Sequence, residues 1–401
     1  MPSLIHLLLI IFVSLLTQGC ESQQPPIRVG VLHSLTGTMA FSEKPLVDAL
    51  TLAAEELNRQ KGGVLGRRIE LVIVDGKSDD AQFALEAERL ITEEKVAVIF
   101  GCWTSSCRKA IKPVIEKHQH LLFYPLQYEG LEQSPDIIYT GATPNQQIIP
   151  SLPWALKNLG TSFLLIGSDY IYPRTANTII KEILPILKGK VLGEHYIPLG
   201  ATDMHALMQA IEKHQPDVII NTINGDSNIP FFKALKQLPF IPVISYSIAE
   251  PELQQIDPRL TEGHYSVWNY FQSIDTPRNQ LFTKLFKQRF GQHRTISDPM
   301  EASYIGLHLW AKAAKQAKST QAQDIKNAIN YISLNAPEGR VAVNAKNHHL
   351  WKTTRIGLAL ENGQFEIVWQ SNNPLKPQPF PHYKSKFQWQ TYLLSQQNKA
   401  R

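Results

Sequence analysis

Hydrophobic positions along the chain follow two spacings, one typical of buried strands and the other of amphipathic helices. Short apolar runs such as "IRVGVLHS" and "VAVIFG" each end in a polar loop. Between them, longer segments such as "KPLVDALTLAAEELNRQKGG" place Leu46, Leu50 and Leu57 on one helical face. Strand and helix alternate in this way from Ile27 to about residue 143, which predicts a parallel sheet covered by helices.

A second series of the same kind begins near residue 144 with segments such as "TSFLLIGSDYIYPR" and "PDVIINTINGDSN". No linker-like change of composition separates the two series, and 401 residues are enough for two hydrophobic cores. We therefore predict an α/β fold with two Rossmann-like lobes, each built on a parallel sheet and joined by several crossovers.

The first twenty residues differ from the rest of the chain. The segment from Leu4 to Leu16 is apolar, too short to span a bilayer comfortably and of the length of a signal-peptide core. It ends in "LTQGC", which resembles the lipobox of bacterial lipoproteins, so residues 1–20 are predicted to be a signal peptide with lipidation at Cys20. An ordinary signal peptide or an uncleaved anchor are the alternatives. The lipoprotein interpretation places the protein in the periplasm, held on a membrane, with "ESQQPP" as a short tether.

The distribution of charge and the absence of certain motifs indicate which classes of partner the protein is not expected to bind. The net charge of +5 is spread over segments that carry both signs, without a dense Lys/Arg block, so no nucleic-acid partner is expected. The histidines in "KHQH" and "NHH" lack further ligands at metal-site spacing, and no phosphate-binding loop or hydrolase elbow is present. We therefore expect no metal and no cofactor.

Polar and aromatic residues gather in the loops that follow the predicted strands, where open parallel sheets bind ligands. These loops are "HSLTGTM", "DGKSDD", "GCWTSS", "YPLQYEG", "GSDYIYPR", "NTINGDSN" and "SYSIAE". If the two lobes face each other, the loops line one cleft.

The same stretches, with "PNQQ", "GHYSVWNYFQSIDTP", "DPMEASYIG" and "APEGRVAV", carry a resemblance that covers about residues 27–378. The chain resembles the type I periplasmic-binding-protein family of branched-chain amino acid and amide transporters, and within it the urea-binding branch. The resemblance implies a two-lobed protein that binds urea and docks on the permease of an ABC transporter. It places lobe one at residues 27–143 plus 271–345, lobe two at 144–270 plus 346–380, and a C-terminal tail at 381–401.

Other ligands and functions stay open at this stage. A short-chain amide such as acetamide or formamide, or a branched-chain amino acid, is the alternative ligand. A cytosolic amide-sensing regulator shares part of the motif set, but the export signal and "NTINGDSN" favour transport. An amidase with Cys102 as nucleophile is the enzymatic alternative, and no base or acid partner is evident in the loops.

Four candidate binding residues belong to the first lobe. Ser105 matches a serine that contacts ligand in the amide sensor, although Ser105 or Ser106 can instead cap the helix that starts there. Trp103 offers a flat wall for a planar ligand, with core packing as the alternative. Tyr124 and Gln127 fall in the ligand-contacting region by family pattern, and Gln127 can accept urea N–H groups.

Three candidates belong to the second lobe. Tyr170 aligns with a ligand-contacting tyrosine, whereas it can also pack between the lobes. Asp226 can accept N–H bonds from urea or cap a helix that starts near Ile229. Glu250 is a similar candidate, which a helix start at Pro251 would also explain.

Cys102 and Cys107 lie in the same loop as Trp103 and Ser105. Their close spacing has to satisfy strict disulfide geometry, so two free buried thiols are preferred over a disulfide.

Overall fold

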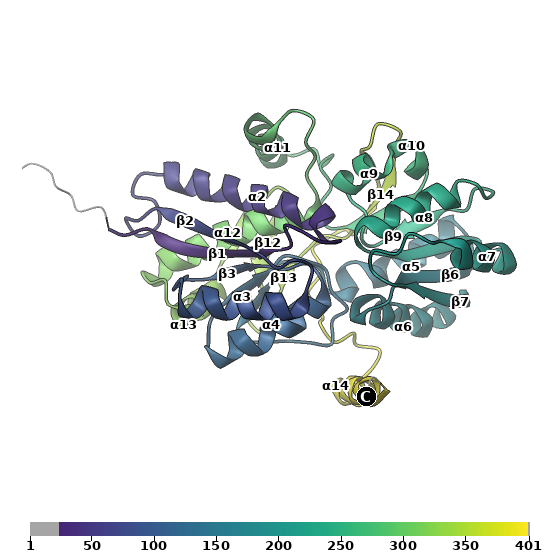
Figure 1. The fold of residues 1–401 in the computed structure, drawn as a ribbon, viewed down its shortest axis with the longest axis horizontal. Coiled ribbons are helices and arrows are strands. Elements are labelled where there is room, and N and C mark those ends of the chain that lie inside the picture. The colour runs from purple at the N-terminus through teal and green to yellow at the C-terminus, as the bar shows by residue number, and fades with distance from the viewer. Residues whose placement is uncertain (1–23, 400–401) are drawn as a thin grey trace, which may run out of the picture.

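Five parallel strands form the sheet of the first lobe, in the order β2-β1-β3-β4-β5. The strands are β1 (Ile27–His33), β2 (Ile69–Asp75), β3 (Ile99–Gly101), β4 (Leu122–Tyr124) and β5 (Ile137–Tyr139). The helices that surround them are α2 (Ala40–Arg59), α3 (Asp80–Thr92), α4 (Ser105–Lys117), α11 (Pro277–Phe290), α12 (Asp298–Ala317) and α13 (Ala322–Ile329). Strand β1 is buried along almost its whole length, since helices cover both faces of the sheet, as Figure 1 shows.

Seven strands form the sheet of the second lobe, in the order β15-β14-β10-β9-β8-β6-β7. The parallel strands are β6 (Ser162–Ser168), β7 (Lys190–Ile197), β8 (Val218–Thr222), β9 (Val243–Ser245) and β10 (Tyr265–Trp268). The helices of this lobe are α5 (Ile148–Asn158), α6 (Ile171–Ile186), α7 (His205–His214), α8 (Asn228–Leu235), α9 (Glu250–Ile256) and α10 (Pro258–Thr261). Two strands that the sequence patterns do not predict, β14 (Arg355–Ala359) and β15 (Phe365–Gln370), extend the edge antiparallel to β10.

A small antiparallel sheet joins the core of the first lobe. It consists of β11 (Ser333–Ala336), β12 (Gly339–Val343) and β13 (Leu350–Trp351). The chain passes between the lobes three times, between β5 and β6, between β10 and α11, and between β13 and β14. The predicted boundary at residues 345/346 falls inside the β12–β13 hairpin, and the lobe boundaries stay a prediction.

The predicted tail at residues 381–401 contains a docked helix, α14 (Lys386–Lys399). Trp389 is fully buried in a hydrophobic cluster of the second lobe, and its Nε1 donates a hydrogen bond of 2.9 Å to the Pro381 carbonyl. The Tyr392 hydroxyl donates to Thr178 Oγ1 of helix α6 at 3.1 Å. The tail is therefore held on the second lobe by one large aromatic side chain and its neighbours.

The computed structural model describes residues 24–399. The predicted signal peptide and Cys20 lie outside the described residues. Within residues 24–399, none of the helices has both the length and the apolar character needed to cross a bilayer.

Candidate ligand site between the lobes

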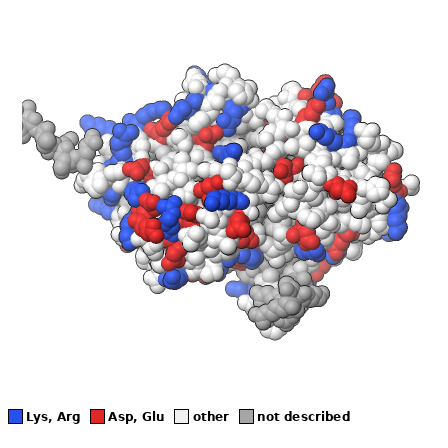
Figure 2. Space-filling model, in the orientation of Figure 1, with Lys and Arg blue, Asp and Glu red and all other residues white. Residues whose placement is uncertain are grey.

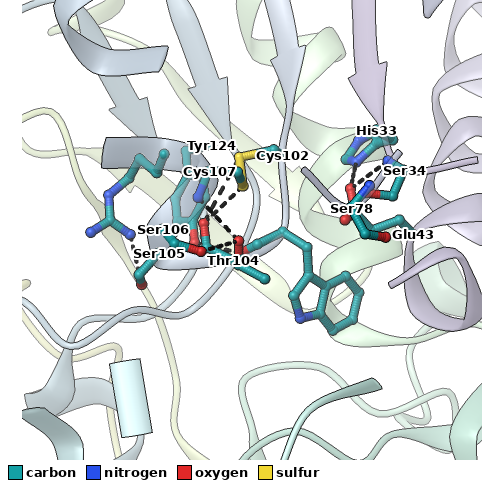
Figure 3. The surroundings of a disulfide bond; sticks show 12 residues. His33, Ser34, Glu43, Ser78, Cys102, Thr104, Ser105, Ser106, Cys107 and Tyr124 are labelled. Atoms are coloured by element: carbon teal, nitrogen blue, oxygen red, sulfur yellow. Dashed lines mark hydrogen bonds and ion pairs between the residues drawn. A yellow bond between two sulfur atoms is a disulfide. The ribbon is translucent and has the colours of Figure 1, made fainter. Parts of the chain in front are cut away.

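The loop from strand β3 to helix α4 carries a disulfide between Cys102 and Cys107, so the expectation of two free thiols is wrong. The strand-to-helix turn brings the two Cα atoms to 6.4 Å, within the range that a disulfide bridges. Thr104 caps the helix, since its Oγ1 accepts a hydrogen bond of 3.1 Å from the Cys107 N–H, so neither Ser105 nor Ser106 serves as the cap. Figure 3 shows Ser105 and Tyr124 beside this bridge.

Ser105 belongs to a buried ionic network centred on Arg108. The Arg108 guanidinium donates to Ser105 Oγ at 3.0 Å, to Glu129 Oε1 at 3.0 Å and to Glu132 Oε1 at 2.8 Å. The Ser105 hydroxyl in turn donates to the other oxygen of Glu129, and Lys109 Nζ lies 3.2 Å from Glu132 Oε2. Two cations and two carboxylates balance each other, so the network has no net charge.

The ionic states of this network follow from its geometry. Burial alone would raise the pKa of Glu132, but Arg108 and Lys109 outweigh burial and lower the pKa to about 2. The two carboxylates raise the pKa of Arg108 well above its usual value, although its burial acts in the opposite direction. Arg108 therefore stays charged, and its charge is neutralised by Glu129 and Glu132 within the first lobe.

Two tyrosines face this network from the two sides of the cleft. The Tyr124 hydroxyl donates to the Trp103 carbonyl at 2.6 Å, and the Arg108 guanidinium lies 4.9 Å from the Tyr124 ring centre. Tyr170, the residue before helix α6 in the second lobe, has its ring centre 6.4 Å from that of Tyr172, and the charges of Glu129 and Arg108 act on its hydroxyl. Burial raises the pKa of both tyrosines, so both hydroxyls are protonated and able to donate.

Gln127 reaches across the cleft. Its Nε2 donates a hydrogen bond of 2.8 Å to the Tyr246 carbonyl of the second lobe. Burial raises the pKa of Tyr172, so its hydroxyl is protonated and able to donate. Gln127 Oε1 and the Tyr172 hydroxyl are both buried without a hydrogen-bond partner among the described residues. A buried acceptor and a buried hydroxyl at the contact between the lobes thus keep unused hydrogen-bonding capacity.

Trp103 closes the same cleft from the side of the first lobe. The side chain is 4% exposed, and its Nε1 donates to Asn224 Oδ1 of the second lobe at 3.3 Å. The structure therefore brings five of the seven candidate residues together around one interlobe cluster. These residues are Trp103, Ser105, Tyr124, Gln127 and Tyr170.

Asp226 lies in a different contact between the lobes. It is the middle residue of the 3₁₀ turn η2 (Gly225–Ser227) and accepts a hydrogen bond from the Thr38 hydroxyl of the first lobe. Helix α8 starts at Asn228 with Ser227 before it, so Asp226 does not cap that helix. Nearby, the Ser42 hydroxyl donates to Glu252 Oε1 at 2.8 Å, also across the lobes. Asp226 thus holds the two lobes together at the start of helix α2.

Glu250 lies at the hinge and not with the five clustered residues. It is fully buried at the first residue of helix α9, and its Oε1 accepts a hydrogen bond of 2.6 Å from the Gln272 N–H. Helix α9 starts here with Pro251 as its second residue, as the alternative interpretation expected. Burial raises the pKa of Glu250 to about 8.

The structure adds residues that the sequence analysis did not single out. These residues are Arg108, Glu129, Tyr172, Asn224 and Tyr246. Four of them stand in or directly beside the same strand-end loops that the sequence analysis identified, and Arg108 follows one turn later on helix α4. In residues 24–399, no group of three His, Cys, Asp or Glu side chains is arranged to hold a metal ion.

The chain is similar in sequence and in fold to known proteins. A family model described as periplasmic binding protein domain matches residues 27–386. The chain is 24% identical over 394 residues to "Leu/Ile/Val-binding protein homolog 7" of Brucella melitensis, with 90% of this chain and 96% of the relative covered. Among solved structures, a solute-binding protein of R. palustris in complex with 4-hydroxybenzoate superposes with a TM-score of 0.80. Its sequence identity is 22%, and 87% of this chain and 98% of that chain are covered.

A shorter stretch of the chain matches a protein whose name describes an enzyme. A stretch of 117 residues, 29% of this chain, is 38% identical to limonene hydroxylase of Geobacillus stearothermophilus. The match spans 21% of that relative. So small a share of the relative does not carry its activity to this chain.

Replacement of Glu250 by Gln should change how stability depends on pH. The folded state holds the Glu250 proton up to about pH 8, whereas the unfolded state releases it near pH 4.5, so the free energy of unfolding should fall as pH rises between these values. Glu250→Gln should remove up to about 1.4 kcal/mol per pH unit of this slope. Thermal unfolding followed by calorimetry at several pH values measures it. The exposed Glu262→Gln is the control, and equal slopes in both variants would contradict the assignment.

Proposed function

We propose that this chain, which belongs to the periplasmic binding protein domain family, is the substrate-binding protein of an ABC importer, and that its ligand is urea. Members of this family bind solutes and are not enzymes, and membership implies an extracytoplasmic location. The enzymatic alternative also loses its nucleophile, because Cys102 is bonded to Cys107 and has no free thiol. Lipid anchoring at Cys20 and docking on a permease belong to the same proposal.

The observation that carries the ligand proposal is the pair of unpartnered polar groups in the cleft. Urea offers four N–H donors and one carbonyl oxygen. Gln127 Oε1 can accept an N–H group, and the Tyr172 hydroxyl can donate to the carbonyl oxygen. Because both atoms are buried, a ligand that pairs with them offsets a desolvation cost that the protein carries without it.

Charge balance at the cleft supports an uncharged ligand. A ligand carboxylate needs an uncompensated cation or a set of free donors. Arg108 already pairs with Glu129 and Glu132, and Lys109 pairs with Glu132, so the network offers no spare positive charge. An amino acid, which the name of the Brucella relative suggests, or an aromatic acid like the one bound in the R. palustris protein, would meet an electrically neutral wall.

A ligand panel tests the proposal. Isothermal titration calorimetry of the exported protein should give saturable heat with urea, weaker heat with acetamide and formamide, and none with leucine, isoleucine or 4-hydroxybenzoate. The reason is that only urea presents N–H donors on both sides of a carbonyl without a charge. Saturable heat with leucine and no heat with urea would contradict the proposal and indicate an amino acid binding protein.

Tyr172→Phe tests the role of the unpartnered hydroxyl. The affinity for urea should fall about fivefold, because one hydrogen bond contributes roughly 1 kcal/mol. The free energy of unfolding without ligand should not fall, since the hydroxyl has no partner to lose. Tyr246→Phe is the matched control: its hydroxyl bonds to Ser151 Oγ at 2.7 Å within the second lobe, so its loss should lower stability and spare affinity. Equal urea affinities of Tyr172→Phe and the unaltered protein would show that the Tyr172 hydroxyl does not bind urea.

Glu129→Gln tests whether charge balance sets ligand choice. The change leaves Arg108 and Lys109 opposed by Glu132 alone, so the network gains one positive charge. The ratio of carboxylate to urea affinity, measured with acetate and urea by calorimetry, should rise at least about tenfold. Glu116→Gln, an acid outside the cleft that pairs with Lys112, should leave the ratio unchanged. An unchanged ratio in Glu129→Gln would show that charge balance does not exclude carboxylates.

A further inference from the structure

Lysines and arginines from distant parts of the sequence meet at one edge of the first-lobe sheet, the edge where its strands begin. Helices α2, α3 and α12 run opposite to the strands they cover, so their last turns reach this edge. The basic face is defined here by Lys61 after helix α2, Arg67 and Arg68 before strand β2, Lys95 after helix α3, and Lys315 and Lys318 at the end of helix α12.

Specific contacts show that these cations share one face. Arg67 donates to the carbonyls of Pro25 and Pro26 at 2.7 and 3.0 Å, which ties it to the start of the described chain. Lys315 Nζ donates to Gln60 Oε1 at 2.9 Å, which joins the ends of helices α12 and α2. Lys95 and Arg67 line one hollow of 480 Å³ beside Pro26. Figure 2 shows Lys and Arg side chains at this end of the molecule, with Asp and Glu side chains between them.

The basic face carries an excess of positive charge. None of its six cations has an ion-pair partner among the described residues. Glu70 of strand β2 and Glu94 after helix α3 both form ion pairs with Arg28. Only two acids near this edge, Glu93 and Asp324, lack an ion pair within the described part of the chain. Lys61, Arg68, Lys95, Lys315 and Lys318 are all exposed, so the excess charge faces solvent.

We propose that the basic face binds anionic lipid headgroups of the membrane that holds the chain's N-terminus. The choice of a membrane as the partner of the basic face follows from the position of the residues that precede Gln24. The residues before Gln24 carry the apolar segment from Leu4 to Leu16 and Cys20, both of which are membrane-attachment elements by sequence. Cys20 lies four residues before Gln24, a span of at most about 14 Å. An anchor at that point holds the basic face within one or two Debye lengths, about 8 Å each, of the headgroups.

This surface is separate from the ligand cleft. The strands of a parallel sheet begin at one edge and end at the other, and the cluster around Ser105, Tyr124 and Gln127 lies where they end. Headgroup binding therefore leaves the cleft free. The inference does not depend on which ligand the cleft takes.

Vesicle sedimentation tests the proposal with a chain that starts at Glu21 and so carries no lipid. All three hydrophobic clusters lie within residues 27–393, so this chain keeps its complete cores. It should sediment with vesicles that contain phosphatidylglycerol and stay in solution with pure phosphatidylcholine vesicles. Binding should vanish at about 1 M NaCl, where the Debye length is about 3 Å.

Matched charge reversals locate the surface. The triple variant Lys61→Glu, Arg68→Glu and Lys318→Glu should bind the anionic vesicles at least about tenfold more weakly. The control triple Lys188→Glu, Lys213→Glu and Lys233→Glu changes three exposed lysines of the second lobe and should lose far less. Both triples should bind urea as the unaltered protein does, so failure of this proposal is distinct from failure of the ligand proposal.

Three outcomes would overturn the proposal. The first is no sedimentation with anionic vesicles at low salt. The second is an equal loss of binding in the two triple variants. The third is equally tight binding to duplex DNA at the same salt concentration, which would show a surface that takes any polyanion and not one that takes lipid headgroups.

Discussion

The candidate site depends on one buried cation, Arg108. Its guanidinium reaches the loop after β3 through Ser105 and the loop after β4 through Glu129 and Glu132, and it packs 4.9 and 4.6 Å from the ring centres of Tyr124 and Tyr128. An isolated buried charge is costly, and removal of one partner from a buried ion pair typically costs about 3–5 kcal/mol. The loops that form the first-lobe wall of the cleft are therefore held in a single arrangement. The same pairing that orders the wall also makes it electrically neutral, so one network sets both its shape and its charge.

Closure of the lobes rests on weaker contacts. The hydrogen bonds Trp103–Asn224, Gln127–Tyr246, Thr38–Asp226 and Ser42–Glu252 all cross between the lobes. Each such bond contributes about 1 kcal/mol net, far less than the cores within each lobe. A lobed protein held shut in this way can open readily, and a ligand that adds hydrogen bonds to both walls shifts it toward the closed form. The difference between strong order within each lobe and weak contact between lobes is what a reversible binding protein requires.

The sequence predicted the alternation of strands and helices because the spacing of apolar residues is a local property. It also predicted the strand-end loops as the ligand region, and five of its seven candidates meet there. The remaining features are non-local. Arg108 pairs with residues 21 and 24 positions away, and Thr38 meets Asp226 at a distance of 188 positions, so neither contact leaves a periodic signal. Strands β14 and β15 were missed because they only add an antiparallel edge to an otherwise parallel sheet. The cysteines were misjudged because their pairing depends on a turn whose geometry their spacing alone does not give.

The topology of the first-lobe sheet explains why a single lobe offers two chemically different surfaces. In a parallel sheet every strand ends at the same edge, so hydroxyl, amide and aromatic residues of the loops gather where a small ligand binds. Helices α2, α3 and α12 end at the opposite edge, where lysine and arginine beside a helix C-terminus complement the helix dipole. The basic face at the strand beginnings thus arises from the same arrangement that builds the cleft at the strand ends. Lys315 and Lys318 at the end of helix α12 join cations from the turns that follow α2 and α3, and their shared position next to Pro25 and Pro26 gives this surface a collective charge.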